Sequence, residues 1–237
     1  MKRLSYLKVI GDSGYAKLSL VRGIPGGEYF VEKSLKVIID FQERLFENEI
    51  KVHSMLDHRY IIRFIERTDN YKFLMEYAPN GNLEKVILSD ADDAVRVKYC
   101  LQFLRGLLHL HEFGYVHNDI KPSNILVTRD NRAKLSDFAF TGKIGEVSFT
   151  NIPSFFKLGT DFFRNPRMEH TAPVNRVEND IYSSGVVLYL LFSRHKVRKG
   201  IDYNAVKNPA LQSIVTGCLK GEFTTVSDII AGLEGVF

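Results

Sequence analysis

The chain has 237 residues, of which 45% are hydrophobic, enough to build the core of one large domain or of two small lobes. Its 32 basic and 28 acidic residues give a net charge of +4, which is too mild and mixed to favour nucleic acid as a partner. No apolar run is long enough for a signal peptide or a membrane-spanning helix, so we expect a soluble, intracellular protein without a membrane partner.

The N-terminal part of the chain is predicted to form three strands, over residues 6–10, 18–22 and 29–35. The first turn contains Gly11 and Gly14, and a glycine-rich turn between paired strands lets backbone N–H groups approach a phosphate. From these residues alone, a plain hairpin turn is the better interpretation.

A helix is predicted next, because Asp40 and Glu43 have the spacing of an N-cap signature and apolar residues then recur at helical spacing as far as Leu56. Two strands, over 60–67 and 71–76, are predicted to follow. A long helix over 93–113 ends at Gly114. Cys100 in this helix and Cys218 lack metal-ligand spacing and are predicted to be buried, reduced thiols.

A short polar loop follows the long helix, between the apolar pairs Tyr115-Val116 and Ile125-Leu126. A polar loop between such anchors is usually kept for chemistry. Asp119 can accept a proton from a hydroxyl, Lys121 can neutralise a transferring phosphate, and Asn124 can offer a carbonyl oxygen to a hard cation. The set fits phosphoryl transfer.

A second hard carboxylate, Asp137, stands 13 residues after Asn124 (137 − 124). Short strands over 125–128 and 133–135 form a hairpin between them, so both side chains could face one Mg²⁺ ion on ATP phosphates. Apolar helices over 180–191 and 225–237 are predicted near the end of the chain.

The polar loop resembles the catalytic loop of the eukaryotic protein kinase family, whose pattern is His-Arg-Asp, four residues and Asn, although Asn118 replaces the Arg. Asp137-Phe138-Ala139 is similar to the family triplet Asp-Phe-Gly. Residues 159–167 resemble Gly-Thr-x-x-Tyr/Phe-x-Ala-Pro-Glu, with Asn165 and Arg167 in place of Ala and Glu.

The resemblance covers nearly the whole chain and implies an α+β, bilobal protein kinase fold. It implies a single domain over 1–237, with an N-lobe of about residues 1–76, a hinge of about 76–81 and a C-lobe of about 82–237. The N-lobe would hold an antiparallel sheet and the helix called helix C, and the C-lobe would be mostly helical.

ATP and Mg²⁺ are the cofactors that the resemblance implies. The residues that would form the nucleotide site come from the glycine-rich loop, the strands, helix C and the hinge: Gly11, Asp12, Ser13, Gly14, Tyr15, Ala16, Leu18, Val31, Lys33, Glu49, Met75, Glu76 and Ala78. Lys33 would bind phosphate and pair with Glu49. The backbone of Glu76 and Ala78 would bond the adenine edge beside Met75.

The same resemblance assigns the chemistry. Asp119 would be the catalytic base, with Lys121 and Lys33 as catalytic cations and Thr160 positioning Asp119 and Lys121. Asn124 and Asp137 would be the metal ligands. Asp180 would bond the backbone of the catalytic loop.

The implied function is that of a serine/threonine protein kinase, because Lys121, two residues after Asp119, is the serine/threonine form. We expect a monomer that acts on protein Ser and Thr hydroxyls. The alternative is a pseudokinase, supported by Ser13, Ala16, Ala139 and the altered Asn165-Pro-Arg167. A small-molecule kinase is disfavoured, because residues 159–166 resemble a segment that shapes a peptide groove.

Asn118 leads to an expectation about how the activity is regulated. The family Arg at this place grips a phosphate on the activation segment, so phosphorylation of Ser148, Thr150 or Ser154 would lack that partner here. Activity should then not depend on such phosphorylation. The compact C-lobe and altered motifs also resemble those of a virus-encoded kinase.

Overall fold

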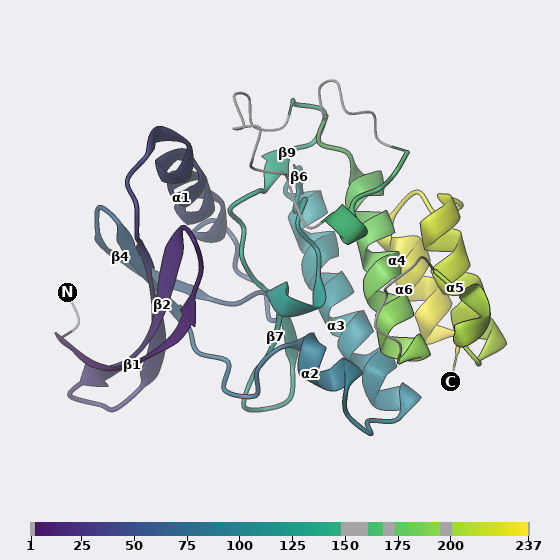
Figure 1. The fold of residues 1–237 in the computed structure, drawn as a ribbon, viewed down its shortest axis with the longest axis horizontal. Coiled ribbons are helices and arrows are strands. Elements are labelled where there is room, and N and C mark those ends of the chain that lie inside the picture. The colour runs from purple at the N-terminus through teal and green to yellow at the C-terminus, as the bar shows by residue number, and fades with distance from the viewer. Residues whose placement is uncertain (1–2, 148–160, 168–173, 195–200, 237) are drawn as a thin grey trace.

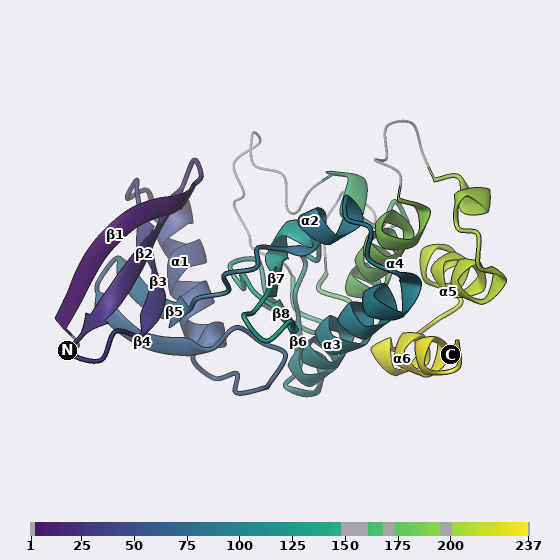
Figure 2. The same cartoon turned by 90° about the horizontal axis from the view of Figure 1, so that it is seen from below.

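The computed structural model describes residues 3–147, 161–167, 174–194 and 201–236. A five-stranded antiparallel sheet of order β1-β2-β3-β5-β4, covered by α1, lies at one end of the molecule, and the longer helices lie at the other (Figures 1 and 2). The predicted α+β, bilobal fold is confirmed.

The first lobe contains the sheet strands and α1, with these bounds: β1 Arg3–Asp12, β2 Ala16–Ile24, β3 Tyr29–Leu35, α1 Asp40–His53, β4 Phe64–Asp69 and β5 Lys72–Glu76. The second lobe contains longer helices and two small hairpin-like sheets: α2 Leu83–Ile87, α3 Asp93–Glu112, β6 Tyr115–Val116, β7 Ile125–Val127, β8 Ala133–Leu135, β9 Gly142–Lys143, α4 Val177–Ser193, α5 Pro209–Lys220 and α6 Val226–Glu234. The strands β7 and β8 pair with each other, as do β6 and β9.

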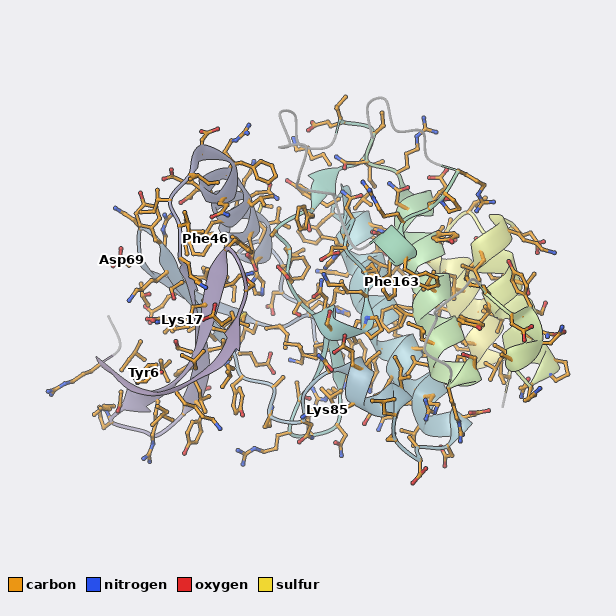
Figure 3. The ribbon with its side chains drawn as sticks, in the orientation of Figure 1. Tyr6, Lys17, Phe46, Asp69, Lys85 and Phe163 are labelled. Atoms are coloured by element: carbon orange, nitrogen blue, oxygen red, sulfur yellow. The ribbon has the colours of Figure 1, made fainter. Side chains whose placement is uncertain are left out.

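Helix α1 packs on one face of the sheet through Phe46 and Ile50, which form one apolar cluster with Val31, Phe73 and Met75. Phe46 is labelled in Figure 3. Side chains alternate between the two faces of a strand. Lys33 therefore points to the face that α1 covers, and its strand neighbours Glu32 and Ser34 point to the other.

The predicted start of α1 was wrong in detail. Ile39, with φ −122° and ψ 147°, occupies the N-cap position and makes no side-chain cap bond, whereas Asp40 is the first helical residue. A capping side chain must belong to the extended residue that precedes the first turn. The Asp40 carboxylate instead lies 3.4 Å from Arg44, and its charge still suits the positive end of the helix dipole.

In the second lobe, α3 and α4 carry most of the core, and α4 packs closely on α5. A Cβ atom at Gly185 of α4 would lie 2.5 Å from the Cβ of Cys218, so the contact requires glycine. Cys100 and Cys218 are free and buried, as predicted. Burial raises the pKa of the Cys100 thiol well above its ordinary value and that of Cys218 to about 12. None of the described helices combines the length and apolarity needed to cross a membrane.

Four aromatic rings connect the sheet to the polar loop. The ring of Phe64 in β4 lies 5.6 Å from that of His53 in α1, His53 lies 5.0 Å from Phe138, and Phe138 lies 5.3 Å from His117. His53 and His117 are both buried, and His53 bonds the carbonyl of Ile62 through Nε2. The two lobes are therefore joined by packed side chains as well as by the chain itself.

Arg96 of α3 is fully buried and holds two elements in place. Its guanidinium donates to the carbonyls of Ser89 (2.8 Å) and Ala91 (3.0 Å), in the connection before α3, and to that of Leu191 (2.7 Å) near the end of α4. Unpaired carbonyls in a core are costly, so this side chain should matter for stability.

We expect Arg96→Leu to lower the free energy of unfolding by about 3 kcal/mol, because the buried carbonyl of Leu191 and the partly buried hydrogen bonds to Ser89 and Ala91 would lose their donor. Urea unfolding followed by circular dichroism measures this. The matched control is Arg105→Leu on the same helix, whose exposed pair with Glu234 should contribute less than about 1 kcal/mol. Equal losses in both variants would contradict this role of Arg96.

A second expectation concerns acid stability. Burial lowers the pKa of His53 to about 4, so the folded protein holds this ring neutral while the unfolded chain protonates it near its ordinary value of 6.5. The stability that His53 contributes is present above pH 6.5 and lost as pH falls towards 4, by about 3 kcal/mol in all. In His53→Gln, urea unfolding between pH 6.5 and 4 should show a weaker loss. An unchanged pH slope would refute this.

Candidate active site

Asp180 of α4 fixes the polar loop. Its buried carboxylate accepts the backbone N–H groups of His117 (2.7 Å) and Asn118 (2.9 Å), and His111 Nε2 of α3 lies 2.9 Å from it. The His117 ring makes two further hydrogen bonds. Its Nε2 bonds the carbonyl of Ser136 (3.1 Å), and its Nδ1 accepts the backbone N–H of Asp119 (3.2 Å). The predicted contact of Asp180 with this backbone is present.

Within the loop, Asp119 is held by the two residues predicted to act with it. Lys121 Nζ donates to Asp119 Oδ2 at 2.7 Å, and Asn124 Nδ2 donates to the same oxygen at 2.9 Å. Burial raises the pKa of the Asp119 carboxyl above its ordinary value, although the charge of Lys121 opposes this. A positioned carboxylate with a raised pKa is better suited to accept a proton.

Lys33 joins α1 to the segment after β8. Its Nζ lies 2.7 Å from the Glu49 carboxylate and 3.1 Å from Asp137 Oδ1. Burial favours the neutral amine, but the carboxylates of Asp137 and Glu49 outweigh it and raise the pKa of Lys33 well above its ordinary value. Burial alone would raise the pKa of the Asp137 carboxyl, but the charge of Lys33 outweighs burial and leaves this pKa below its ordinary value. Asp137 is therefore ionised.

The donor set fits a hard cation. The bonds from Asn124 Nδ2 to the Asp119 carboxylate and carbonyl turn the amide so that Oδ1 is the remaining ligand atom. Asp137, at φ 66°, offers an ionised carboxylate. No cluster of three or more His, Cys, Asp or Glu side chains forms a complete metal site in the described part of the chain. Phosphate oxygens and water would have to supply the other ligands.

The glycine-rich loop between β1 and β2 is closed by Ser13. Its Oγ donates to the carbonyl of Ala16 at 2.9 Å and accepts the Ala16 N–H at 3.0 Å, so a side chain makes the turn where the family pattern has glycine. Gly11 lies in β1, before this turn, where an added Cβ atom would lie 3.1 Å from the Leu18 side chain, and Gly14 has open space around it. Asp12 forms an exposed ion pair with Lys36 at 2.5 Å.

Tyr15, at the loop tip, turns inward. Its hydroxyl donates to the Glu49 carboxylate at 3.2 Å, and Lys33 Nζ lies 5.3 Å from the centre of its ring. The loop tip therefore lies against the Lys33–Glu49 pair.

The predicted adenine-lining residues lie in one apolar cluster. Val31 and Met75 are buried there, and Leu18 and Ala78 pack against them. Leu126 of β7, which sequence reasoning left out of the site, joins the same cluster. Its position two residues after Asn124 was the available signal.

The backbone of Glu76 and Ala78, in the hinge, was predicted to bond the adenine edge. The N–H of Glu76 donates to the carbonyl of Arg63 (2.9 Å), and its carboxylate pairs with Lys134 (2.7 Å), so only its carbonyl could meet a base edge. The N–H of Ala78, by contrast, has no hydrogen-bond partner among the described residues.

Ala139, which stands where the family triplet has Gly, is held by contacts with α1. Ala139 is buried against Phe41 and Leu45 and needs no positive φ, and Asn48 of α1 donates to the carbonyls of Ala139 (3.1 Å) and Thr141 (2.8 Å). Sequence reasoning did not assign this role to Asn48, although it directly precedes Glu49. The segment after Asp137 is thus tied to α1.

At the other end of this segment, Thr160 lies outside the described residues, as do Ser148, Thr150 and Ser154. Arg167 donates to the carbonyls of Leu219 (3.1 Å) and Lys220, at the C-terminal end of α5. Its charge therefore meets the negative end of a helix dipole.

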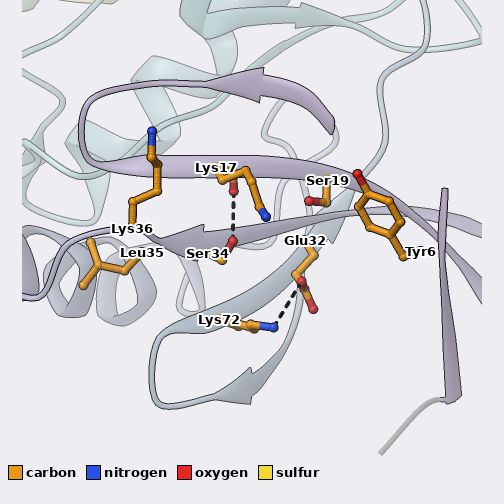
Figure 4. A pocket seen from close by; sticks show the side chains of 8 residues that line it. All are labelled: Tyr6, Lys17, Ser19, Glu32, Ser34, Leu35, Lys36 and Lys72. Carbon is orange, nitrogen blue, oxygen red and sulfur yellow. Dashed lines mark hydrogen bonds and ion pairs between the residues drawn. The ribbon is translucent and has the colours of Figure 1, made fainter. Parts of the chain in front are cut away.

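A cavity of about 620 Å³ lies elsewhere, on the sheet face opposite α1 (Figure 4). It is lined by Tyr6, Lys17, Ser19, Glu32, Ser34, Leu35, Lys36 and Lys72. None of these belongs to the predicted site, and the alternation of the strands separates it from Lys33.

Comparisons with known proteins agree with this geometry. Residues 4–229 match the model of the protein kinase domain. The chain is 30% identical over 200 residues to maternal embryonic leucine zipper kinase of Danio rerio, covering 81% of this chain and 29% of that protein. It is 29% identical over 204 residues to serine/threonine-protein kinase cds1 of Schizosaccharomyces pombe, covering 79% of this chain and 44% of that protein.

The chain thus spans less than half the length of these curated relatives. The domain match nevertheless takes in nearly all of its residues, including the polar loop, Lys33, Glu49 and Asp137. On this basis, the chain belongs to the protein kinase family.

Proposed function

We propose that this protein transfers the γ-phosphate of ATP to serine or threonine hydroxyls of protein substrates. The observation that carries the proposal is the arrangement around Asp119, whose carboxylate is held by Lys121 and Asn124. The charged Lys33–Asp137 pair adds a cation and a metal-ligand carboxylate. These are the groups that phosphoryl transfer needs for positioning and charge stabilisation.

In this mechanism, Asp119 orients the substrate hydroxyl and accepts its proton, and Lys121 stabilises charge on the transferring phosphoryl group. Lys33, held by Glu49, binds the phosphates of ATP. Asn124 and Asp137 would hold Mg²⁺, which when bound neutralises charge on the phosphate oxygens. Leu18, Val31, Met75 and Leu126 would enclose the adenine, and the Ala78 N–H would bond its edge.

Specificity for serine and threonine rests on two supports. Lys121 stands two residues after Asp119, and one of the similar proteins is named as a serine/threonine kinase. We further propose that activity does not require phosphorylation of the activation segment, because Asn118 replaces the Arg that would bind such a phosphate.

The first test is transfer of labelled γ-phosphate from Mg·ATP to the protein itself and to a generic basic protein. Asp119→Asn and Lys33→Met should each lower transfer at least ~10²-fold, because each removes a group that acts on the reacting atoms. Lys72→Met, on the opposite sheet face, and Asp130→Asn, in the exposed turn after β7, are the matched controls and should keep full activity.

Absence of transfer by the unaltered protein would overturn the proposal. Retained ATP-dependent thermal stabilisation in that case would indicate a pseudokinase that acts as a nucleotide-binding module.

A second test addresses phosphorylation. Treatment with a phosphatase, or replacement of Ser148, Thr150 and Ser154 by Ala, should change kcat less than about twofold, because Asn118 offers no cation for a phosphate. Mass spectrometry of the treated protein verifies that no phosphate remains. Loss of activity that returns on rephosphorylation would show that the proposal of independence is wrong.

A further inference from the structure

Asn118, the residue that replaces the family Arg, makes bonds that no Arg could make in the same way. Its backbone is left-handed, with φ 64°, a conformation that Asn tolerates better than most residues. Its amide nitrogen donates to the carbonyl of Phe140 (3.1 Å) and to Asn175 Oδ1 (2.8 Å). An amide nitrogen has two donors, and both are used.

Asn175, the acceptor, stands two residues before α4 and is almost fully buried, with 2% of its surface exposed. Its N–H donates to the carbonyl of Glu146 and its own carbonyl accepts the N–H of Gly145, both at 2.9 Å. A Cβ atom at Gly142 of β9 would lie 2.2 Å from Asn175 Nδ2, so the side chain packs directly on that backbone.

These contacts join three separate parts of the chain. The catalytic loop contributes Asn118, directly before Asp119. The segment that begins with the metal-ligand residue Asp137 contributes the carbonyl of Phe140 and the backbone of residues 142–146. The stretch before α4 contributes Asn175. We call the Asn118 and Asn175 side chains with the Phe140 carbonyl the amide bridge.

We propose that Asn175 is a positioning residue for phosphoryl transfer, and that the amide bridge fixes the Asp119 loop relative to the Asp137 segment. The inference rests on the proposed function and explains how that site would be held without a phosphate. All three groups are neutral and present in the unmodified chain, so the arrangement needs neither a modification nor a partner. Buried hydrogen bonds of this length resist displacement by water.

The bridge can be tested by a double-mutant cycle. Asn118→Gly removes the side chain while keeping the left-handed backbone available, and Asn175→Ala removes the acceptor. Each should lower kcat about 10-fold to 100-fold, because a small misplacement of catalytic groups has that effect. The KM for Mg·ATP should stay within about twofold, because the lysine and apolar residues that would bind ATP are untouched.

If the two residues act as a unit, the double variant should be no slower than Asn118→Gly alone, within about twofold. The matched control is Asn131→Gly, at another left-handed Asn (φ 54°) in the exposed turn between β7 and β8, which should keep full kcat. Multiplying effects, or an unchanged kcat in Asn175→Ala, would overturn the inference.

A second readout does not depend on catalysis. Hydrogen–deuterium exchange of the peptide over residues 140–147 should accelerate in both single variants, because the Asn175 backbone carbonyl that accepts the Gly145 amide would no longer be held by the amide bridge. It should not change in Asn131→Gly. If the unaltered protein shows no transfer, the proposed function fails, and this measurement alone decides on the bridge. Unchanged exchange in both variants would then refute it.

Discussion

The buried carboxylate of Asp180 is the interaction on which the site depends. No Lys or Arg pairs with it in the described residues, so two backbone N–H groups and His111 must compensate for removing it from water. Those two N–H groups belong to consecutive residues, His117 and Asn118, and their bonds fix the direction in which the chain enters the loop. They hold the backbone at the residues that lead directly into Asp119.

Departures from the family pattern are compensated close to where they occur. Ser13 closes with its hydroxyl a turn that glycine would leave open. Ala139 fills a small apolar space against α1. Arg167, which stands where the family pattern has Glu, donates to the carbonyls that end α5. Each replacement is thus supported by contacts of its own.

The sequence predicted the parts of the site that are local. Asp119, Lys121 and Asn124 lie in one loop, and their mutual contacts follow from short spacing. The pairing of Lys33 with Glu49 came from the resemblance, since a 16-residue separation leaves no local signal.

The failures have physical reasons too. Asn175 contacts Asn118 across 57 residues, and no periodicity reports such a contact. The stretch around Cys218 looked helical, but the bounds of α5 were not predicted, although Asn208 and Pro209 form a recognisable start. Asn208 caps the Ala210 and Leu211 amides, and Pro209 follows at the first helical position. Asp40 was wrongly predicted as the N-cap of α1, because the cap position depends on the backbone angles of Ile39 and the side chain of Ile39 gives no sequence signal for them.

The burial of both thiols has a practical consequence. Cys100 and Cys218 are the two cysteines of the chain, and with raised pKa values neither presents thiolate to reagents in water. A cysteine placed on the surface would therefore be labelled selectively without removing the native ones. Fluorophores or spin labels on the two lobes could then report the distance between α1 and α4 in an otherwise unaltered chain.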